Sequence, residues 1–273
     1  MLPENLVRRL TQLPGMRSLW LKFPVGSVER RVRFGVSPRP HYAYGVYAAA
    51  DQARRLGIPE ISVFEFGVAG GRGLLALESI AAEIGAELGV KISVFGFDAG
   101  GGMPSPEGYR DLPHIWDVGF FKMDADALRS RLKTAKLVLG QIDETLPAFM
   151  RAGGFPPIGF IAFDFDYYSS TKRAFALFEG PPETHLPRTY CYFDDIMWPL
   201  QACHNEWVGE LCAIREFNLE HETQKLAPVH MLRYMLPHAA AWQEQIYVMH
   251  DFTHPLYCTN LTDKTDEHTQ LPL

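Results

Sequence analysis

The sequence predicts an α/β fold in which a mostly parallel β-sheet is covered by helices on both faces. Five short runs rich in β-branched and aromatic residues alternate with segments of helical periodicity. The runs are mostly apolar, as strands buried on both faces are. The 273 residues, 47% of them hydrophobic, suit one large α/β domain or two small ones. Strands joined by helices in this order form a parallel sheet.

The elements follow from local patterns in chain order. The predicted strands are residues 61–66, 91–97, 135–139, 158–163 and 189–193. The predicted helices are residues 41–56, 74–88, 128–133, 145–152 and 171–178, the first of them ended by Gly57-Ile58-Pro59. Beyond them we expect a helix around 200–214 and two β-like runs, 229–235 and 245–252, that pair as a hairpin at the sheet edge.

Residues 1–40 are predicted to form a lid or connector, and residues 41–273 a single domain with an extended C-terminal part. Leucines recur at helical spacing at the start of the chain: Leu2, Leu6, Leu10 and Leu13. Residues 24–40 contain three prolines and two glycines and are expected to be an irregular basic connector. This pattern favours a lid or docking helix over a helix that lies on a membrane.

Charge and composition exclude several classes of protein. The net charge of −6 argues against nucleic-acid binding driven by overall charge. Residues 1–60 hold ten Lys and Arg against four Asp and Glu, so a basic segment precedes an acidic body and is a candidate cover for an anionic ligand. The sequence contains no run of about 18 apolar residues, so it predicts no membrane span. The four cysteines match no zinc spacing and fit a reduced, cytoplasmic setting.

Acidic residues follow four of the five predicted strands, at the edge where parallel sheets bind ligands. A glycine-rich turn with Gly67, Gly70 and Gly71 follows the first strand and lets a ligand approach the backbone. Asp98 ends the second strand, where a carboxylate accepts hydrogen bonds from the two hydroxyls of a ribose. Together these features favour a cofactor of adenosine type.

A second group of carboxylates predicts a metal site. Asp164 ends the fourth strand, and Asp194 and Asp195 end the fifth, so adjacent strands bring the three together. Clustered carboxylates are costly unless a cation neutralises them. Oxygen ligands without His or Cys favour Mg²⁺ or a similar hard cation.

These motifs resemble those of a known family. Phe64-Glu65-Phe66-Gly67-Val68 with Gly70-Gly71 resembles motif I of class I S-adenosylmethionine-dependent methyltransferases. Four further segments, over residues 42–200, are similar to the macrocin O-methyltransferase family: Phe97-Asp98 with Gly102-Met103-Pro104, Gly140 with Glu144-Thr145-Leu146-Pro147, Asp164 to Thr171, and Tyr192-Phe193-Asp194-Asp195. Any one of them is weak, but five in the right order make the match fairly specific.

The resemblance implies a Rossmann-like methyltransferase fold with seven strands, S-adenosylmethionine as methyl donor, and a Mg²⁺-type ion. Carried over by motif, the residues around the cofactor are Glu65, Gly67, Gly70 and Gly71 beside the methionine part, Asp98 at the ribose, and Gly140, Gln141, Ile142 and Asp143 beside the adenine. Asp164, Asp194 and Asp195 hold the metal and thereby orient the hydroxyl of a small acceptor, of sugar or natural-product type. Our candidate general base is His114, in the loop after the second strand.

The sequence also departs from the family, and rival functions stay open. Ala99-Gly100-Gly101-Gly102 replaces the usual bulky and acidic residues, so acceptor specificity does not carry over. A nicotinamide-dependent oxidoreductase shares the glycine turn but has no use for the three aspartates. A binding protein that keeps the fold without turnover is the other alternative.

The basic segment and the long tail are candidate contacts of a homodimer.

Overall fold

The structure, a computed structural model, describes residues 3–262; Leu2 of the predicted leucine stripe and the last eleven residues of the predicted domain lie outside this range. Seven strands form one sheet in the order β3-β2-β1-β4-β5-β7-β6. They are β1 (Glu60–Phe66), β2 (Lys91–Asp98), β3 (Lys136–Leu139), β4 (Ile158–Phe163), β5 (His185–Phe193), β6 (Gln224–Pro228) and β7 (Ile246–Asp251). The first five are parallel, which confirms the predicted α/β sheet, and β7 runs antiparallel between β5 and β6.

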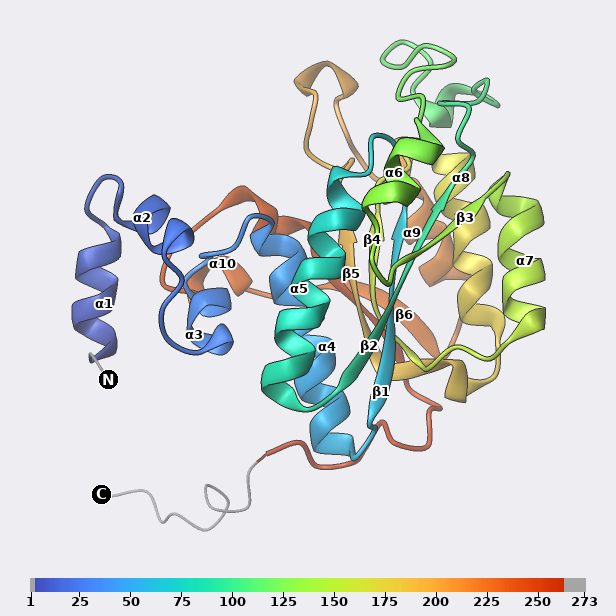
Figure 1. The fold of residues 1–273 in the computed structure, drawn as a ribbon. Helices are drawn as coiled ribbons and strands as arrows, with labels where there is room; N and C mark the ends of the chain where they lie inside the picture. The colour runs from blue at the N-terminus through green and yellow to red at the C-terminus, as the bar shows by residue number, and fades with distance from the viewer. Residues whose placement is uncertain (1–2, 263–273) are drawn as a thin grey trace.

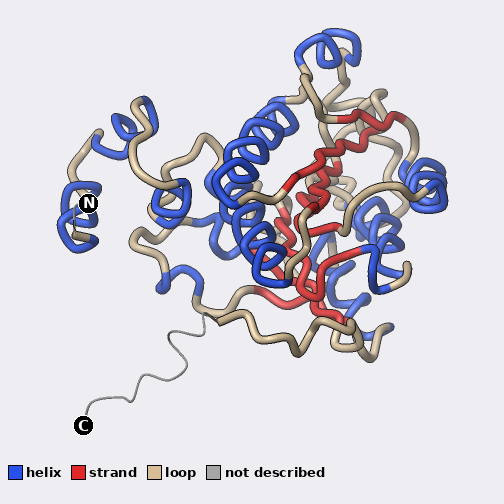
Figure 2. The backbone as a smooth tube through the Cα atoms, turned by 60° about the horizontal axis from the view of Figure 1, so that its bottom comes forward, coloured by secondary structure: helices blue, strands red, loops and turns tan. Residues whose placement is uncertain are grey.

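Helices cover both faces of this sheet (Figure 1). One face is covered by α4 (Pro40–Leu56) and α5 (Arg72–Leu88), and the other by α7 (Ile142–Ala152), α8 (Tyr168–Ala174) and α9 (Gly209–Glu220). Figure 2 shows the strands running between these two groups. The core under α7 to α9 is rich in phenylalanine, including Phe64, Phe163 and Phe217. The shorter α6 (Ala125–Arg131) precedes β3.

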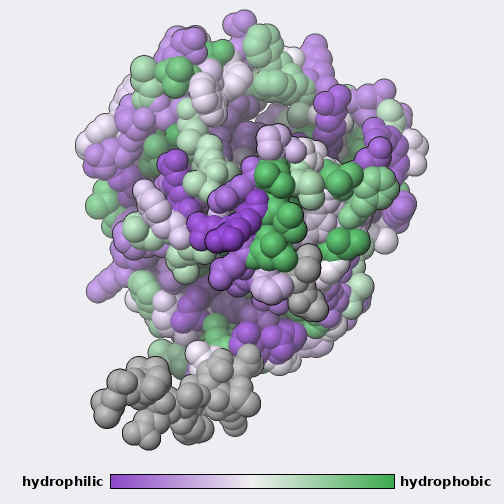
Figure 3. Space-filling view, turned by 90° about the vertical axis from the view of Figure 1, so that its left-hand side faces the viewer, coloured by the Kyte–Doolittle hydropathy of each residue, from purple (hydrophilic) through white to green (hydrophobic). Residues whose placement is uncertain are grey.

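The N-terminal segment contains three helices, α1 (Glu4–Thr11), α2 (Met16–Lys22) and α3 (Val28–Arg33). The third corrects the irregular connector predicted for 24–40: Ser27 caps it by accepting a hydrogen bond from the Arg30 N–H, and Val28 and Val32 are buried. Arg31 pairs with Glu83 of α5 at 2.6 Å. Figure 3 views the face that carries α1 and α2, where apolar side chains lie beside strongly hydrophilic ones.

The C-terminal part differs from its prediction in two places. The helix expected around 200–214 begins at Gly209, because residues 200–202 form a short 3₁₀ turn and a loop follows. The β-like run at 229–235 is wrong: the edge strand is β6, ending at Pro228, and α10 (Leu232–Met235) follows it. Pro228 is tolerated because β6 pairs only with β7. An antiparallel pair does form at this edge of the sheet, but its outer strand is β6, which precedes the predicted run, and not residues 229–235. In the described part of the chain, no helix has the length and apolar character to cross a bilayer.

Candidate functional site

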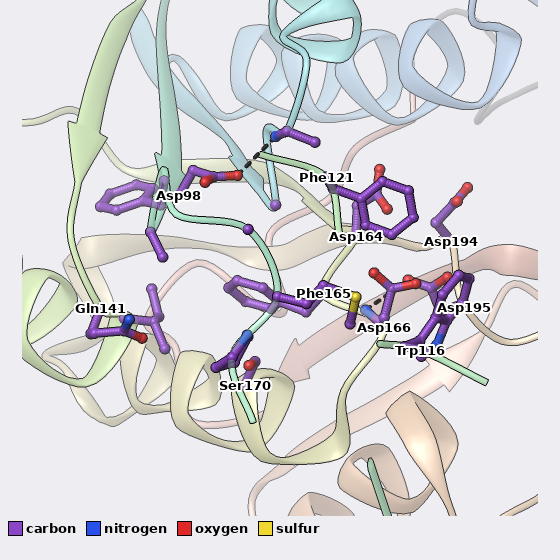
Figure 4. Close-up of a pocket in the computed structure, with 18 of the residues that line it drawn as sticks. Asp98, Trp116, Phe121, Gln141, Asp164, Phe165, Asp166, Ser170, Asp194 and Asp195 are labelled. Carbon is purple, nitrogen blue, oxygen red and sulfur yellow. Dashed lines mark hydrogen bonds between the residues drawn. The ribbon is translucent and has the colours of Figure 1, made fainter. Parts of the chain in front are cut away.

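A cavity of about 330 Å³ opens at the carboxyl edge of the sheet. It lies where the strand order reverses between β1 and β4, which is where open α/β sheets bind ligands. Figure 4 shows Asp98 and Gln141 at one end of the cavity and Asp164, Asp194 and Asp195 at the other. One cavity therefore joins the predicted cofactor residues to the predicted metal ligands.

Strand register explains why these residues meet. Phe66 of β1 pairs with Phe97 of β2 and with Phe163 of β4, which in turn pairs with Phe193 of β5. The four phenylalanines form one row across the sheet, so the residues after them leave the sheet at the same height. Those residues are Gly67, Asp98, Asp164 and Asp194, and all four line the cavity.

The glycine turn is dictated by close contacts of the backbone. Gly67 has φ +80°, and a Cβ on it would lie 1.7 Å from the main-chain oxygen of Asp164. Gly71 has φ +78°, and its Cβ would lie 2.3 Å from a methyl carbon of Leu128. Gly70 faces open space. Neither Gly70 nor Gly71 lines the cavity. The first glycine thus brings β1 and β4 together at the floor of the cavity.

Asp98 holds this turn in place. One carboxylate oxygen accepts hydrogen bonds from the backbone N–H groups of Val68 and Ala69, both at 2.8 Å, and the other accepts from that of Gly100 at 2.6 Å. Asp98 therefore fixes the loops after β1 and β2 against each other. Only Oδ1 keeps a lone pair for a further donor, because Oδ2 already accepts two hydrogen bonds, and the ribose contact stays a prediction.

Glu65 lies beneath the turn rather than in the cavity wall. It is 1% exposed, and its Oε1 accepts a hydrogen bond from the Tyr42 hydroxyl at 2.9 Å. A Cβ on Gly73 would lie 1.8 Å from the same oxygen, so the carboxyl group packs against the start of α5. Burial raises the pKa of Glu65 from 4.5 to about 8. Oε2 is buried without a hydrogen-bond partner among the described residues.

The third strand contributes the wall beside Asp98. Gly140, Gln141 and Ile142 line the cavity, whereas Asp143 is exposed and lies outside the wall. The backbone N–H of Gly140 donates to the main-chain oxygen of Asp98 at 3.0 Å. A Cβ on Gly140 would lie 2.6 Å from a side-chain carbon of Thr145. This end of the cavity offers a narrow slot between backbone segments.

At the opposite end, Asp164, Asp194 and Asp195 place one oxygen each within 4.8 Å of the others. Burial, followed by repulsion from Asp195 and Asp194, raises the pKa of Asp164 well above its ordinary value. Burial and the neighbouring Asp166 and Asp194 do the same for Asp195. Three carboxyl oxygens that repel one another suit a hard divalent cation, so the donor set fits the predicted metal.

Two further acidic residues support this cluster. Asp166 adopts φ +60°, and its backbone N–H donates to Asp195 Oδ2 at 2.9 Å. Glu210, at the first turn of α9, accepts a hydrogen bond from the Asp195 N–H at 3.1 Å and is fully buried. Burial raises the pKa of Asp166 to about 7 and that of Glu210 well above its ordinary value. Asp166 also lines the cavity, whereas Glu210 lies behind Asp195 and extends the cluster away from it.

Sequence and structure comparisons identify the fold. No family model matches the sequence, and a search of curated proteins finds no match. Among solved structures, a calicheamicin methyltransferase, CalS11, is similar over 84% of this chain and 88% of its own, with a TM-score of 0.50 and 20% identity. The O-methyltransferase NovP is similar over 75% of this chain and 91% of its own, with a TM-score of 0.49 and 14% identity. The fold is that of the class I methyltransferases.

Within this methyltransferase fold, loop 99–124 projects beyond the strand ends (green, Figure 1). It contributes Trp116 and Phe121 to the cavity wall, with ring centroids 5.8 Å apart. His114 lies in the same loop but is exposed and outside the wall, so the structure does not bring it to the carboxylates. No side chain from residues 3–40 lines the cavity either.

Sequence reasoning missed two residues of this site. Glu210 belongs to a segment predicted only as a helix, and no local signal says that its first turn reaches Asp195. Gln245 donates from Nε2 to the main-chain oxygens of Phe193 and Asp194, at 3.1 and 2.8 Å. Both residues contact partners that are distant in the sequence, and a motif within one segment does not reveal such contacts.

Proposed function

We propose that the protein transfers the methyl group of S-adenosylmethionine to a hydroxyl oxygen of a small molecule with the help of a divalent cation. The single observation that carries this proposal is the row of strand ends in one cavity. Gly67 and Asp98 lie at the nucleoside end, and Asp164, Asp194 and Asp195 lie at the other. A cofactor and an acceptor bound side by side are what methyl transfer requires.

The nucleoside end suits S-adenosylmethionine in shape and chemistry. The turn at Gly67 leaves backbone room for the methionine part, Asp98 accepts from the ribose, and Gly140 to Ile142 face the adenine. Glu65 and Asp143 do not line the cavity. Glu65 bonds to Tyr42 beneath the glycine turn, and Asp143 is exposed at the start of α7. The bound sulfonium supplies an electrophilic methyl group and leaves as a neutral thioether.

The carboxylate end would hold Mg²⁺ or a similar ion through Asp164, Asp194 and Asp195. Such an ion lowers the pKa of an acceptor hydroxyl and fixes its direction. The protein's part would be positioning: an ion held by the three side chains would orient the acceptor oxygen, and Trp116 and Phe121 line the same cavity. His114 as the general base stays a prediction.

The acceptor, the cellular setting and the assembly are proposed on separate grounds. One similar solved structure is described as a calicheamicin methyltransferase, which supports an acceptor hydroxyl of sugar or natural-product type. The four cysteines are unpaired, which supports a reducing cytoplasm. A homodimer would cover the exposed Leu19, Phe23 and Val25 of the N-terminal segment.

Calorimetric titration of S-adenosylmethionine and S-adenosylhomocysteine, with Mg²⁺ and with chelator, tests the proposal. Wild type is compared with Asp98→Ala and with Asp126→Ala, a control at an exposed residue of α6 that does not line the cavity. We expect micromolar binding to wild type and to the control, and a loss of at least tenfold in Asp98→Ala. Absence of binding to folded wild type would overturn the methyltransferase and favour a nicotinamide-dependent enzyme, which a parallel NADH titration detects. Binding without transfer to any hydroxyl acceptor would indicate a binding protein.

A further inference from the structure

Tyr192 stands beside the carboxylate cluster but is not one of its acids. It lies on β5 two residues before Asp194, so both side chains emerge on the same face of the strand. Its hydroxyl donates a hydrogen bond to Asp194 Oδ1. The Tyr192 side chain is buried, with 3% of the residue exposed. The hydroxyl therefore has little freedom to seek another partner.

The Tyr192 ring is itself held by the first turn of α4. The His41 ring stacks on it with centroids 4.3 Å apart and planes at 25°. Tyr42 meets it edge-on at 5.8 Å. On the strand, Tyr192 pairs with Ala162 of β4 and Ile246 of β7. Neighbouring helix and strands thus fix both the backbone and the ring of this tyrosine.

Asp194 is fixed at its backbone by other groups. Its N–H donates to the Phe163 main-chain oxygen at 3.0 Å, and its own oxygen accepts from Gln245 at 2.8 Å. Rotation of the side chain is the freedom that remains, and the Tyr192 hydroxyl restricts it by holding one carboxylate oxygen. Asp195 is restrained in a comparable way by the Asp166 N–H.

We propose that Tyr192 is a positioning residue for the metal site: by holding Asp194 Oδ1 it directs the other oxygen toward Asp164 and Asp195. The inference rests on the metal part of the proposed function. Partners that orient a metal ligand set its affinity, commonly by ten- to a hundredfold. The hydrogen bond also keeps Asp194 in place while the three carboxylates repel one another. His41 contributes by stacking alone.

The test is Mn²⁺ binding to the full chain, measured from the signal of the free ion by electron paramagnetic resonance. Tyr192→Phe removes the hydroxyl and keeps the ring. Tyr190→Phe is the matched control, since Tyr190 lies two residues earlier on the same strand and contacts Tyr44 instead. We expect Tyr192→Phe to bind Mn²⁺ about tenfold more weakly, and Tyr190→Phe to stay within about twofold of wild type. Thermal unfolding checks that each variant is folded.

His41 variants provide a second comparison should Tyr192→Phe fold poorly. His41→Phe keeps a flat ring against Tyr192 and is expected to bind Mn²⁺ as wild type does. His41→Ala removes the stacked ring and is expected to weaken binding. Equal affinity in wild type, Tyr192→Phe and His41→Ala would overturn the inference and leave the metal site standing. A wild type that does not bind millimolar Mn²⁺ would overturn the metal site and this inference together.

Discussion

The buried carboxylate of Asp111 accepts two hydrogen bonds from Ser169, one from its backbone N–H at 2.8 Å and one from its hydroxyl at 2.9 Å. A third comes from the backbone N–H of Glu107 at 2.8 Å. The contact fastens loop 99–124 to the start of α8, next to the strand end that carries Asp164. Asp111 is thus a buried anchor of the loop that carries Trp116 and Phe121, beside the more exposed ion pairs of Arg110 with Glu216 and of Glu107 with Arg173.

Asp111→Ala is expected to release this loop without unfolding the sheet. The change leaves three donors without their acceptor, and an unsatisfied buried group costs about 1–3 kcal/mol. We expect limited proteolysis to cut within 99–124 at least tenfold faster and cofactor affinity to fall. Asp117→Ala, at an exposed position of the same loop, is the control. An uncut loop in Asp111→Ala would show that other contacts suffice.

Gly67→Ala is expected to destabilise the protein far more than Gly70→Ala. At Gly67 the added carbon would meet the Asp164 backbone at 1.7 Å, and the φ of +80° is strained for alanine. At Gly70 it would meet nothing within 4 Å. In urea denaturation, the free energy of unfolding is expected to fall by at least about 2 kcal/mol in Gly67→Ala and by under about 1 kcal/mol in Gly70→Ala. Similar losses at both would contradict the close approach of β1 and β4.

Stability is expected to fall as the pH rises from about 5 to 8, and Glu65 contributes to this. Its pKa is about 8 in the folded protein against 4.5 ordinarily, so between these values the folded state keeps a proton that the unfolded chain loses. This contribution to the free energy of unfolding is complete below pH 4.5 and lost above about pH 8. Between these values the free energy of unfolding falls by at most about 1.4 kcal/mol per pH unit. Glu65→Gln should flatten the measured free energy of unfolding against pH. Glu60→Gln, at the half-buried start of β1 where the side chain faces Lys91, should not.

Cation binding near pH 7 is expected to release protons. Burial and mutual repulsion raise the pKa values of Asp164 and Asp195, and metal binding requires their charged forms. Mn²⁺ affinity should therefore increase with pH. Titration calorimetry in two buffers of different ionisation enthalpy measures the protons released. A heat independent of the buffer would contradict the raised pKa values.

His114→Ala is expected to keep most of the methyl-transfer activity once an acceptor is known. The imidazole is exposed and does not line the cavity, so it does not reach the acceptor oxygen in this arrangement. Steady-state kinetics across pH, with Asp164→Asn as the inactive reference, provides the measurement. A fall in kcat of a hundredfold or more would restore His114 as the base and require loop 99–124 to move.

Local sequence patterns were enough to predict the parallel strands and the acidic residues that follow them. Asp98, Asp164 and Asp194 share one edge of the sheet because the phenylalanines before them pair across the strands, and the acids that follow the predicted strands already indicate this edge. Side chains that depend on the packing of distant segments could not be foreseen. Glu210 reaches Asp195 only through the placement of α9, and Tyr42 reaches Glu65 only through that of α4. The exposed position of His114 likewise depends on how its loop docks.

The edge strand β6 and the inner strand β7 bear on how the chain folds during its synthesis. All five parallel strands emerge before β7, so a nascent chain can form the glycine turn and the row of aspartates early. The outer side of β5 nevertheless has no partner until residues 246–251 appear. Until then β5 exposes an unpaired edge beside Asp194 and Asp195, and such edges invite pairing with other chains. Gln245 reaches the strand end at the same moment. A ribosome that stalls shortly before this point would therefore hold a domain whose carboxylates are in place but whose β5 edge is not yet covered.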